Sequence, residues 1–359
     1  MNRSLKIILA TVLIIAVAFG TIFAIRARNK KKQDGKLNIV VTTFSCYDFS
    51  KQITGDNANV TLLLKPGEDS HSYEPKPGDL AEIKNADVFI YIGGDMEKWV
   101  DKILETDVID TSKTKLIRVT DCIETIEEKE VDGAEEHEHH HGEEGEEHHH
   151  EEEEHQDGYG EEEHHQEDED EEENHEEVHI HEDGAFDEHI WTSPANAKKM
   201  VKFLAQKYGE IDSKNKEIYT ANAEGYIKQI EDVEQKIQEI VDNKKRSRLV
   251  FGDKMPMQYF IDEYGLEVSA AFDGCSTEAE PSAKTVTYLI NKVKEEKIPV
   301  VLYIELSTGK TAKSIAEATG AEAMQIQTLH NISKDDFESG ETYVSLMNRN
   351  LDVLRKALQ

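Results

Sequence analysis

Val88-Phe89-Ile90-Tyr91-Ile92 is a run of five apolar residues, and Val300-Val301-Leu302-Tyr303-Ile304 is a second run of the same kind. A strand that buries one face alternates apolar and polar residues. An unbroken apolar run of this length is instead typical of a strand that is buried on both faces of a parallel sheet. Such a sheet needs helices on both sides, so the two runs predict an α/β fold.

Strand-like segments alternate with helical ones along most of the chain. The segments between the strands, such as Ala283–Lys297 and Thr311–Thr319, have helical composition. The expected strands are Leu37–Thr43, Val60–Lys65, Ala86–Gly93 and Thr114–Thr120, followed by Arg248–Asp253, Leu266–Phe272, Ile298–Leu306 and Ala323–Gln327. This pattern predicts two α/β lobes, residues 37–192 and 247–359, each with a four-stranded and mainly parallel sheet.

A helical segment, residues 193–246, separates the two lobes. Ser193-Pro194 offers a capping hydroxyl followed by proline at the first helical position, and Asp212-Ser213 offers a second start. The apolar residues that follow form a broadly helical stripe: Ile218, Ile227, Ile230, Val233, Ile237, Ile240 and Val241. Because no proline interrupts this stretch, we expect a long rigid helix of about 45 Å to join the lobes.

The negative charge of the chain is concentrated in one segment. Residues 135–183 contain 26 acidic residues, 13 histidines and no Lys or Arg, whereas the net charge of the 359 residues is -34. Nucleic acid is excluded as a partner because phosphate binding needs a basic face. From about Glu124 to Asp183 there are almost no apolar residues, so we expect a disordered loop inserted in the first lobe. Its clustered histidines and carboxylates suit a metal such as zinc.

The first 36 residues contain a membrane signal. Ile7–Ile25 holds 19 residues without a charge, which nearly spans a hydrocarbon core of about 30 Å. The run continues past the small residues Ala16-Val17-Ala18, where a signal peptide could be cleaved, and no cysteine lies near its end. We expect a signal peptide or, preferably, an uncleaved anchor that holds a monomer on the extracytoplasmic face of the membrane. Three cysteines, Cys46, Cys122 and Cys275, cannot all pair within the chain.

Three histidines lie outside the acidic loop. His71 follows the second predicted strand, His189 follows the loop, and His330 follows the eighth strand. A single histidine at such a place is more often a surface or structural residue. Ligands of open α/β sheets, however, bind beyond the carboxyl ends of the strands, and all three histidines fall at such ends or beside the loop. We therefore expect one shared metal site, for which tetrahedral zinc is the best fit.

Several motifs resemble the zinc and manganese solute-binding proteins of ABC importers. They are Thr42-Thr43-Phe44, Gly67 through Pro75, Ala86-Asp87, Gly93, Glu97-Lys98-Trp99, Asp187-Glu188-His189-Ile190-Trp191, Tyr259-Phe260, Tyr264-Gly265-Leu266 and Glu280-Pro281-Ser282. The resemblance covers about residues 37–359. It implies two four-stranded α/β lobes joined by a rigid helix, as the strand pattern predicts. It also implies zinc rather than manganese, because the zinc branch of the family carries a His- and acid-rich loop in the first lobe.

The resemblance places metal ligands on particular residues. The first two fall on His71 and His189, and the last, a carboxylate in many members, falls on His330. The remaining position, usually His or Glu, falls on Lys254, which is a poor ligand because a protonated amine repels a cation. The fourth ligand therefore stays open among Asp253, Glu278, Glu280, Cys275 and water.

These features predict a zinc-binding protein that is not an enzyme. The resemblance implies an extracytoplasmic component of an ABC importer that delivers Zn²⁺ to a membrane permease and its ATPase. The alternatives are a manganese-type solute-binding protein, a metal-dependent adhesin or chaperone, and an extracellular zinc hydrolase. A hydrolase is disfavoured because the sequence has no His-Glu-x-x-His pair, and Ser276 lacks a Gly-x-Ser-x-Gly elbow.

Overall fold

The computed structural model describes residues 35–70, 72–106, 109–134, 186–274 and 280–359. By its contacts the chain divides into two units, one of residues 1–135 and 185–359 and one of residues 136–184, and every described residue belongs to the first. Among the described residues, no helix is both long enough and apolar enough to cross a membrane. The predicted membrane segment, Ile7–Ile25, lies outside the described residues.

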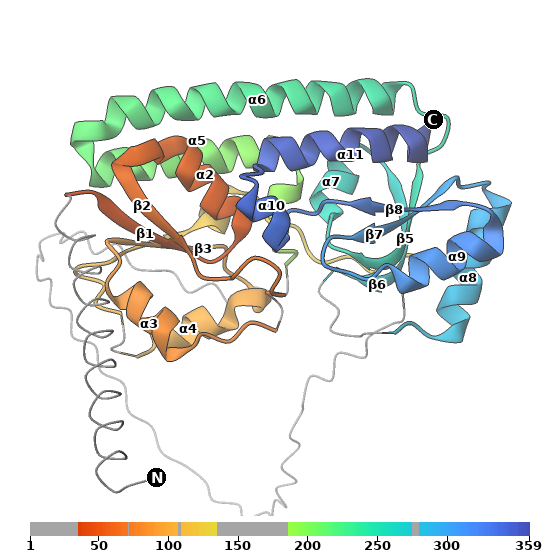
Figure 1. Cartoon of the computed structure of the whole chain (residues 1–359), viewed down its shortest axis with the longest axis horizontal. Helices are drawn as coiled ribbons and strands as arrows, with labels where there is room; N and C mark the ends of the chain where they lie inside the picture. Colours follow the sequence, from red (N-terminus) through yellow and green to blue (C-terminus); the bar gives the residue numbers. More distant parts are fainter. Residues whose placement is uncertain (1–34, 71, 107–108, 135–185, 275–279) are drawn as a thin grey trace, which may run out of the picture. The chain divides into compact units, whose positions relative to one another are not determined.

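The first sheet contains four parallel strands in the order β2-β1-β3-β4 (Figure 1). The strands are β1 (Leu37–Val41), β2 (Ala58–Leu62), β3 (Val88–Tyr91) and β4 (Lys115–Arg118). Helix α2 (Phe44–Thr54) covers one face, and α3 (Pro77–Lys84) with α4 (Lys98–Leu104) covers the other. Short 3-10 turns complete the connections: η1 (Gly55–Asn57), η2 (Asp95–Glu97) and η3 (Val119–Cys122).

Strand β3 is buried on both faces, as its unbroken apolar run predicts. Val88, Ile90 and Ile92 pack in the cluster that includes α2, whereas Phe89 and Tyr91 pack in the cluster that includes α3 and α4. The alternation of side chains along a strand therefore divides the run between the two helical layers.

The second sheet repeats the topology of the first, in the order β6-β5-β7-β8. Its strands are β5 (Arg248–Met255), β6 (Glu267–Asp273), β7 (Val300–Ile304) and β8 (Glu322–Ile326). The helices of this half of the chain are α7 (Gln258–Glu263), α8 (Ala283–Glu295), α9 (Lys310–Thr319), α10 (Lys334–Glu338) and α11 (Tyr343–Leu358), of which α10 lies near α2 of the first lobe. All eight predicted strands are present, with ends that differ by a few residues, and the predicted α/β class with two four-stranded parallel sheets is confirmed.

Two long helices follow the 3-10 turn η4 (Ile190–Thr192). Helix α5 (Pro194–Ile211) begins as predicted, because the Ser193 hydroxyl accepts a hydrogen bond from the backbone N–H of Asn196 at 3.1 Å. After the turn η5 (Ser213–Asn215) comes α6 (Lys216–Asp242), whose 27 residues correspond to a rod of about 40 Å. The prediction that Ile218 belongs to its apolar stripe is wrong, since this side chain is 45% exposed. Counting back from Ile230 in helical steps gives the buried residues Tyr226, Ala223 and Tyr219 instead.

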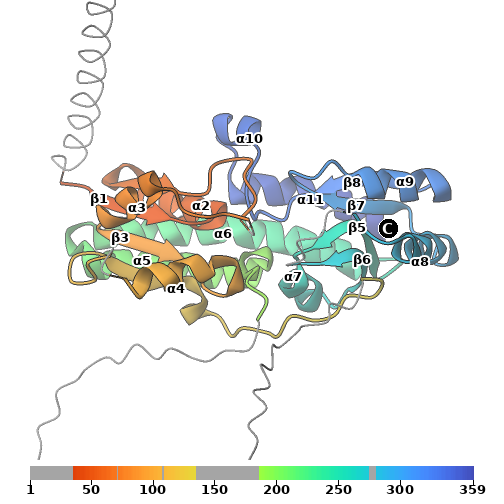
Figure 2. The same ribbon diagram turned by 90° about the horizontal axis from the view of Figure 1, so that it is seen from below.

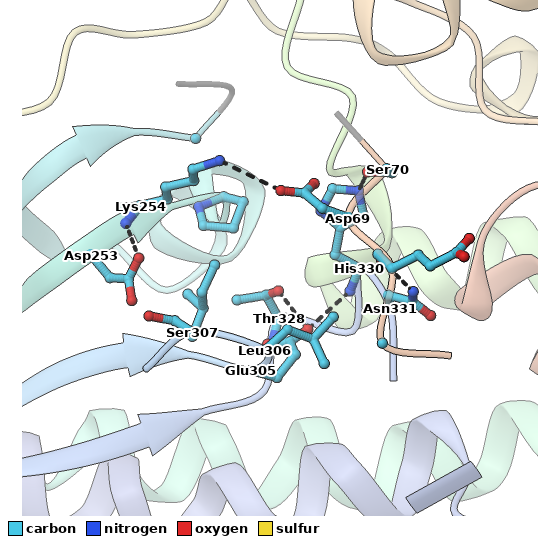
Figure 3. Close-up of a pocket in the computed structure, with 15 residues that line it drawn as sticks. Asp69, Ser70, Asp253, Lys254, Glu305, Leu306, Ser307, Thr328, His330 and Asn331 are labelled. Carbon is cyan, nitrogen blue, oxygen red and sulfur yellow. Dashed lines mark hydrogen bonds and ion pairs between the residues drawn. The ribbon is translucent and has the colours of Figure 1, made fainter. Parts of the chain in front are cut away.

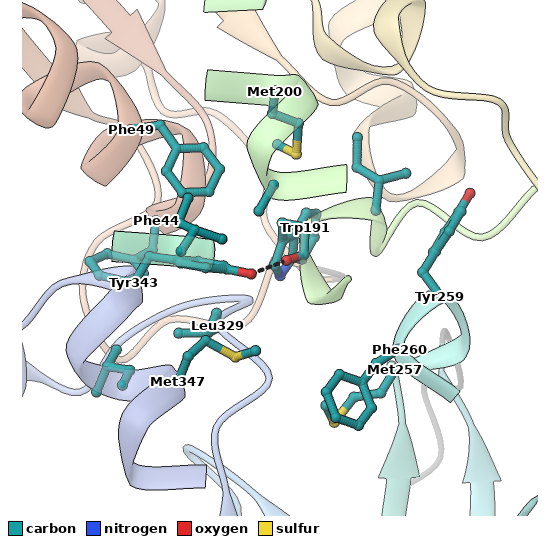
Figure 4. Packing of buried hydrophobic residues seen from close by; sticks show 14 of the residues in the cluster. Phe44, Phe49, Trp191, Met200, Met257, Tyr259, Phe260, Leu329, Tyr343 and Met347 are labelled. Atoms are coloured by element: carbon teal, nitrogen blue, oxygen red, sulfur yellow. Dashed lines mark hydrogen bonds between the residues drawn. The ribbon is translucent and has the colours of Figure 1, made fainter. Parts of the chain in front are cut away.

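The two sheets share one hydrophobic cluster. Figure 4 shows its centre, where Phe44 and Phe49 of the first lobe lie near Trp191 and Tyr343. Helix α11 begins here and ends in the second lobe, where the carbonyl of Leu358 accepts a hydrogen bond from the N–H of Lys245 at 2.8 Å. The lobes are therefore connected by α6, by α11 and by a continuous core.

Residues 124–134 differ from the expectation of a disordered segment that begins at about Glu124. Val131 is buried and Ile126 packs against the shared core, while Glu127 and Asp132 form isolated β-bridges with Phe186 and Ser269. Two apolar side chains and backbone pairing thus order a stretch whose composition is mostly polar. The remainder of the predicted loop, from residue 135, lies outside the described residues.

Two of the three cysteines, Cys46 and Cys122, are free thiols, and the third, Cys275, lies outside the described residues.

Asp48 joins three helices through one buried carboxylate. It belongs to α2, it accepts a hydrogen bond from the hydroxyl of Tyr226 in α6, and it accepts another from the N–H of Tyr343 in α11 at 3.0 Å. Burial raises the pKa of Asp48, although hydrogen bonds from Tyr226 and Gln52 oppose that shift.

Replacing Asp48 with Ala should lower the free energy of unfolding by about 2–4 kcal/mol, because two buried donors then have no acceptor. The matched control is Asp352→Ala in α11, which removes an exposed ion pair with Arg355 and should cost less than about 1 kcal/mol. Urea denaturation of both variants would measure the difference. Equal losses in the two variants would contradict the structural role of Asp48.

Candidate metal centre

A cavity of about 280 Å³ lies where loops from the two lobes meet (Figure 3). The first lobe contributes the segment that follows β2, and the second lobe contributes loops at the carboxyl ends of its strands. The lining residues are Gly67, Glu68, Asp69, Ser70, Asp253, Lys254, Pro256, Gly274, Ile304, Glu305, Leu306, Ser307, Thr328, His330 and Asn331. Two of the predicted site residues, His330 and Asp253, therefore line the same cavity.

His189 is wholly buried and is held in one orientation by Asp187. Oδ1 of Asp187 accepts hydrogen bonds from the backbone N–H of His189 at 2.7 Å and from its ring Nδ1 at 3.0 Å. A ring that donates from Nδ1 carries its lone pair on Nε2, the nitrogen that can bind a metal. Burial disfavours the charged imidazolium, but the carboxylates of Asp187 and Glu188 favour it, and the pKa of His189 is raised above its ordinary value.

His330 reaches the same place from the second lobe. The ring centroids of His330 and His189 are 5.1 Å apart, and the ring planes meet at 82°. Nε2 of His330 is hydrogen-bonded to the hydroxyl of Ser70 and lies 3.0 Å from the sulfur of Met96. Trp191 adjoins both imidazoles, with a centroid distance of 5.5 Å to each. Two imidazoles from different lobes thus lie next to one another, and that of His330 contacts Ser70.

Glu305 fixes the loop that carries His330. Its buried carboxylate accepts hydrogen bonds from the N–H of Thr328 at 2.7 Å, from the Thr328 hydroxyl at 2.8 Å and from the N–H of His330 at 3.2 Å. Leu329, between these partners, has a φ of 63°, a left-handed conformation that is costly for a branched residue. In the sequence Glu305 stands only as a carboxylate after the apolar run Val300–Ile304, which does not reveal that it positions the loop of His330.

The candidates for a fourth ligand differ in their surroundings. Asp253 lines the cavity, and its Oδ1 accepts a hydrogen bond from the N–H of Lys254 at 2.9 Å. The ammonium group of Lys254 lies 3.9 Å from Oδ2 of Asp69 in the first lobe. Glu280 does not line the cavity and forms an ion pair of 2.5 Å with Lys310.

Three predicted site residues, His71, Cys275 and Glu278, lie outside the described residues. Within the described ranges, no group of three or more His, Cys, Asp or Glu side chains is arranged to hold a metal ion. The described part of the site therefore consists of two imidazoles and nearby oxygen atoms. Neutral imidazole oriented by a carboxylate is a donor that suits zinc.

Glu97 adjoins Met96, which contacts His330, and it orders the loop that follows β3 in the first lobe. Its wholly buried carboxylate accepts hydrogen bonds from the N–H groups of Ile92 at 2.7 Å and Gly93 at 2.9 Å, directly after β3. Burial raises the pKa of Glu97 from 4.5 to about 7, although these hydrogen bonds oppose the shift.

Because the pKa of Glu97 is higher in the folded state, its protonated form adds stability that is fully present below about pH 4.5 and is lost as the pH rises through about 7. Between pH 4.5 and pH 8 the ionisation of Glu97 should lower the unfolding free energy of the wild type by up to about 3 kcal/mol. Glu97→Gln cannot ionise and should not show this part of the decrease. Denaturation curves at several pH values would measure it, with Glu105→Gln, an exposed carboxylate on the same side of the lobe, as the control. An unchanged pH slope in the Glu97 variant would contradict this assignment.

Comparison with known proteins identifies the family. The family described as zinc-uptake complex component A, periplasmic, matches residues 39–357. Zinc-binding lipoprotein AdcA of Streptococcus pneumoniae is 31% identical over 335 residues, which cover 93% of this chain and 58% of AdcA. The high-affinity zinc uptake system protein ZnuA of Bacillus subtilis is 29% identical over 323 residues, which cover 90% of this chain and 88% of that protein. The chain thus spans a little over half the length of AdcA and most of the length of the B. subtilis protein.

Solved structures agree with the sequence comparison. The Zn(II)-bound ZnuA-like domain of S. pneumoniae AdcA matches with a TM-score of 0.66 at 28% identity, covering 90% of this chain and 99% of the domain. The metal-dependent lipoprotein YcdH of B. subtilis matches with a TM-score of 0.68 at 26% identity, covering 90% of this chain and all of that one. The resemblance seen in the sequence motifs is confirmed, and since the family match extends over both lobes, the chain belongs to the ZnuA family of periplasmic zinc-uptake components.

Proposed function

We propose that this protein is the extracytoplasmic zinc-binding component of an ABC importer, which passes Zn²⁺ to a membrane permease driven by an ATPase. The observation that carries the proposal is the pair of imidazoles His189 and His330, which come from different lobes with ring centroids 5.1 Å apart. Membership of a zinc-uptake family supports zinc as the cargo. The family is named as a component of an uptake complex, and the proposed role is binding rather than catalysis.

His71, His189 and His330 form the proposed set of nitrogen ligands. His71 directly follows Ser70 in the sequence, and the hydroxyl of Ser70 is hydrogen-bonded to Nε2 of His330. Three imidazoles favour zinc over manganese, which prefers oxygen ligands. For the fourth position we favour an oxygen from Asp253 or water, with Glu278 as the alternative. Glu280 is disfavoured because it is paired with Lys310.

The proposed ligands come from both lobes, and this arrangement allows the ion to be released. Since His189 belongs to the first lobe and His330 to the second, a small displacement between their loops breaks the coordination shell. Lys254 places a positive charge beside the same cavity, which weakens the attraction for a cation. In the proposed role the protein is a monomer that Ile7–Ile25 holds at the membrane. Its proposed partners are the permease and the ATPase.

Changing His189 or His330 to Ala should reduce the affinity for zinc by at least about tenfold, because each change removes one bond of the coordination shell. Competition with a zinc chelator that outcompetes the weaker sites of the acidic loop would measure the loss. Ser307→Ala is the control, since Ser307 lines the same cavity without being a proposed ligand. Wild-type affinity in both histidine variants would exclude the shared site.

Replacing residues 135–183 with a short Gly/Ser linker should leave one tight zinc site and remove several weaker ones. The loop contains 13 histidines and no Lys or Arg, whereas the proposed ligands of the tight site all lie outside it. Zinc content after dialysis and a calorimetric titration would give the two stoichiometries. Loss of the tight site in a variant that remains folded would show that the loop supplies a ligand.

A further inference from the structure

Residues 124–134, which we call the interlobe strap, pass from the first lobe to the second. Figures 1 and 2 show this segment leaving the first sheet after β4 and reaching β6. Asp132 pairs in parallel with Ser269, and the carbonyl of Asp132 accepts a hydrogen bond from the N–H of Ala270 at 3.1 Å. Strand β6 is the edge strand of the second sheet, so the strap pairs with part of an edge whose backbone groups have no neighbouring strand.

Side chains hold the far end of the interlobe strap in place. The carboxylate of Asp132 accepts hydrogen bonds from Arg248 at 3.2 Å, from Ser269 at 3.2 Å and from the hydroxyl of Tyr288. Gly133 has a φ of 101°, and a Cβ at this position would lie 2.8 Å from the ring of Tyr288. Only glycine therefore fits the seat beside this ring. These contacts hold the end of the strap in one position against the second lobe, and we call this contact the docking of the strap.

The near end of the interlobe strap contacts the segment that carries His189. The carbonyl of Ile126 accepts a hydrogen bond from the N–H of Asp187 at 3.0 Å, and Glu127 forms an antiparallel bridge with Phe186. The hydroxyl of Tyr259, in helix α7 of the second lobe, donates to the carbonyl of Asp187 at 2.8 Å and accepts from the N–H of Ile126 at 3.2 Å. One buried hydroxyl of the second lobe therefore binds both the strap and the residue that orients His189.

We propose that Tyr259 is a positioning residue for His189, and that the interlobe strap keeps the His189 segment against the second lobe and so slows the release of the bound metal. This inference rests on the proposed function for the nature of the cargo. While the strap is docked, the His189 segment cannot move away from the second lobe without breaking the hydrogen bonds that Asp187 makes with the hydroxyl of Tyr259 and with the carbonyl of Ile126. Undocking at Tyr259 is then a step in release, and its effect falls on the dissociation rate more than on the association rate.

The test uses the full-length chain loaded with half an equivalent of Zn²⁺, so that the tightest site is filled first. Stopped-flow mixing with a chromogenic chelator measures the dissociation rate. Tyr259→Phe removes only the hydroxyl and should raise this rate by roughly tenfold, with an association rate that changes less than about threefold. The matched control is Tyr208→Phe, which removes a buried hydroxyl that is hydrogen-bonded to Ser50 at 2.5 Å on α2. It should destabilise the fold without changing the dissociation rate.

A second measurement examines the docking without metal. Hydrogen exchange at the amide of Ala270 should be slow in the metal-free wild type and faster in Asp132→Ala, which should also raise the zinc dissociation rate. The control Tyr208→Phe should release zinc at the wild-type rate. If Tyr259→Phe does so as well, the interlobe strap is only structural and the proposal is overturned. Fast exchange at Ala270 in the wild type would overturn the docking itself. A wild type that holds no zinc would count against the proposed function, and exchange at Ala270 would still decide whether the strap docks.

Discussion

Parallel pairing in both sheets is the constraint on which the site depends. In a parallel sheet all carboxyl ends lie at one edge, so the loops that follow them are gathered together. Here Ser70 follows β2, Met96 follows β3, Glu305 follows β7 and His330 follows β8. Ser70 and Met96 both contact Nε2 of His330, so the loop edges of the two sheets meet. The direction of the strands therefore determines where the site lies, and the side chains of the loops determine what it can bind.

More of the fold than of the site could be predicted from the sequence, because the sequence signals of strands and helices lie within short segments. Apolar runs and helix caps identify all eight strands and the start of α5, but the phase of α6 depends on burying Tyr219 rather than Ile218. His330 could be placed from the sequence because it follows β8, whereas His189 follows the acidic loop and could be placed near the site only from its position beside that loop and from the motif that contains it. The interlobe strap could not, because it is ordered by tertiary contacts of Ile126 and Val131 and by pairing with a strand more than a hundred residues away. The role of Glu305 depends on a backbone turn at Leu329 that composition does not reveal.

A shared core limits how the lobes can move. Nε1 of Trp191 donates to the carbonyl of Thr328 at 3.0 Å, and the hydroxyl of Tyr343 donates to the carbonyl of Trp191 at 2.9 Å. Both contacts are buried and lie next to the imidazoles. A large rotation of one lobe would expose this core, whereas a local displacement of the loops that carry the imidazoles would expose less of it. Local loop motion is therefore the less costly way to change the coordination of a bound ion.

Trp191 also gives the molecule an optical property. The chain has two tryptophans, and only Trp191 adjoins the imidazoles of His189 and His330, whereas Trp99 packs against Tyr73 and Phe89 in the cluster on the opposite face of the first sheet. A charge close to an indole ring interacts with its π electrons. A cation at the proposed site would lie close to Trp191, so the ultraviolet emission of this tryptophan should respond to it.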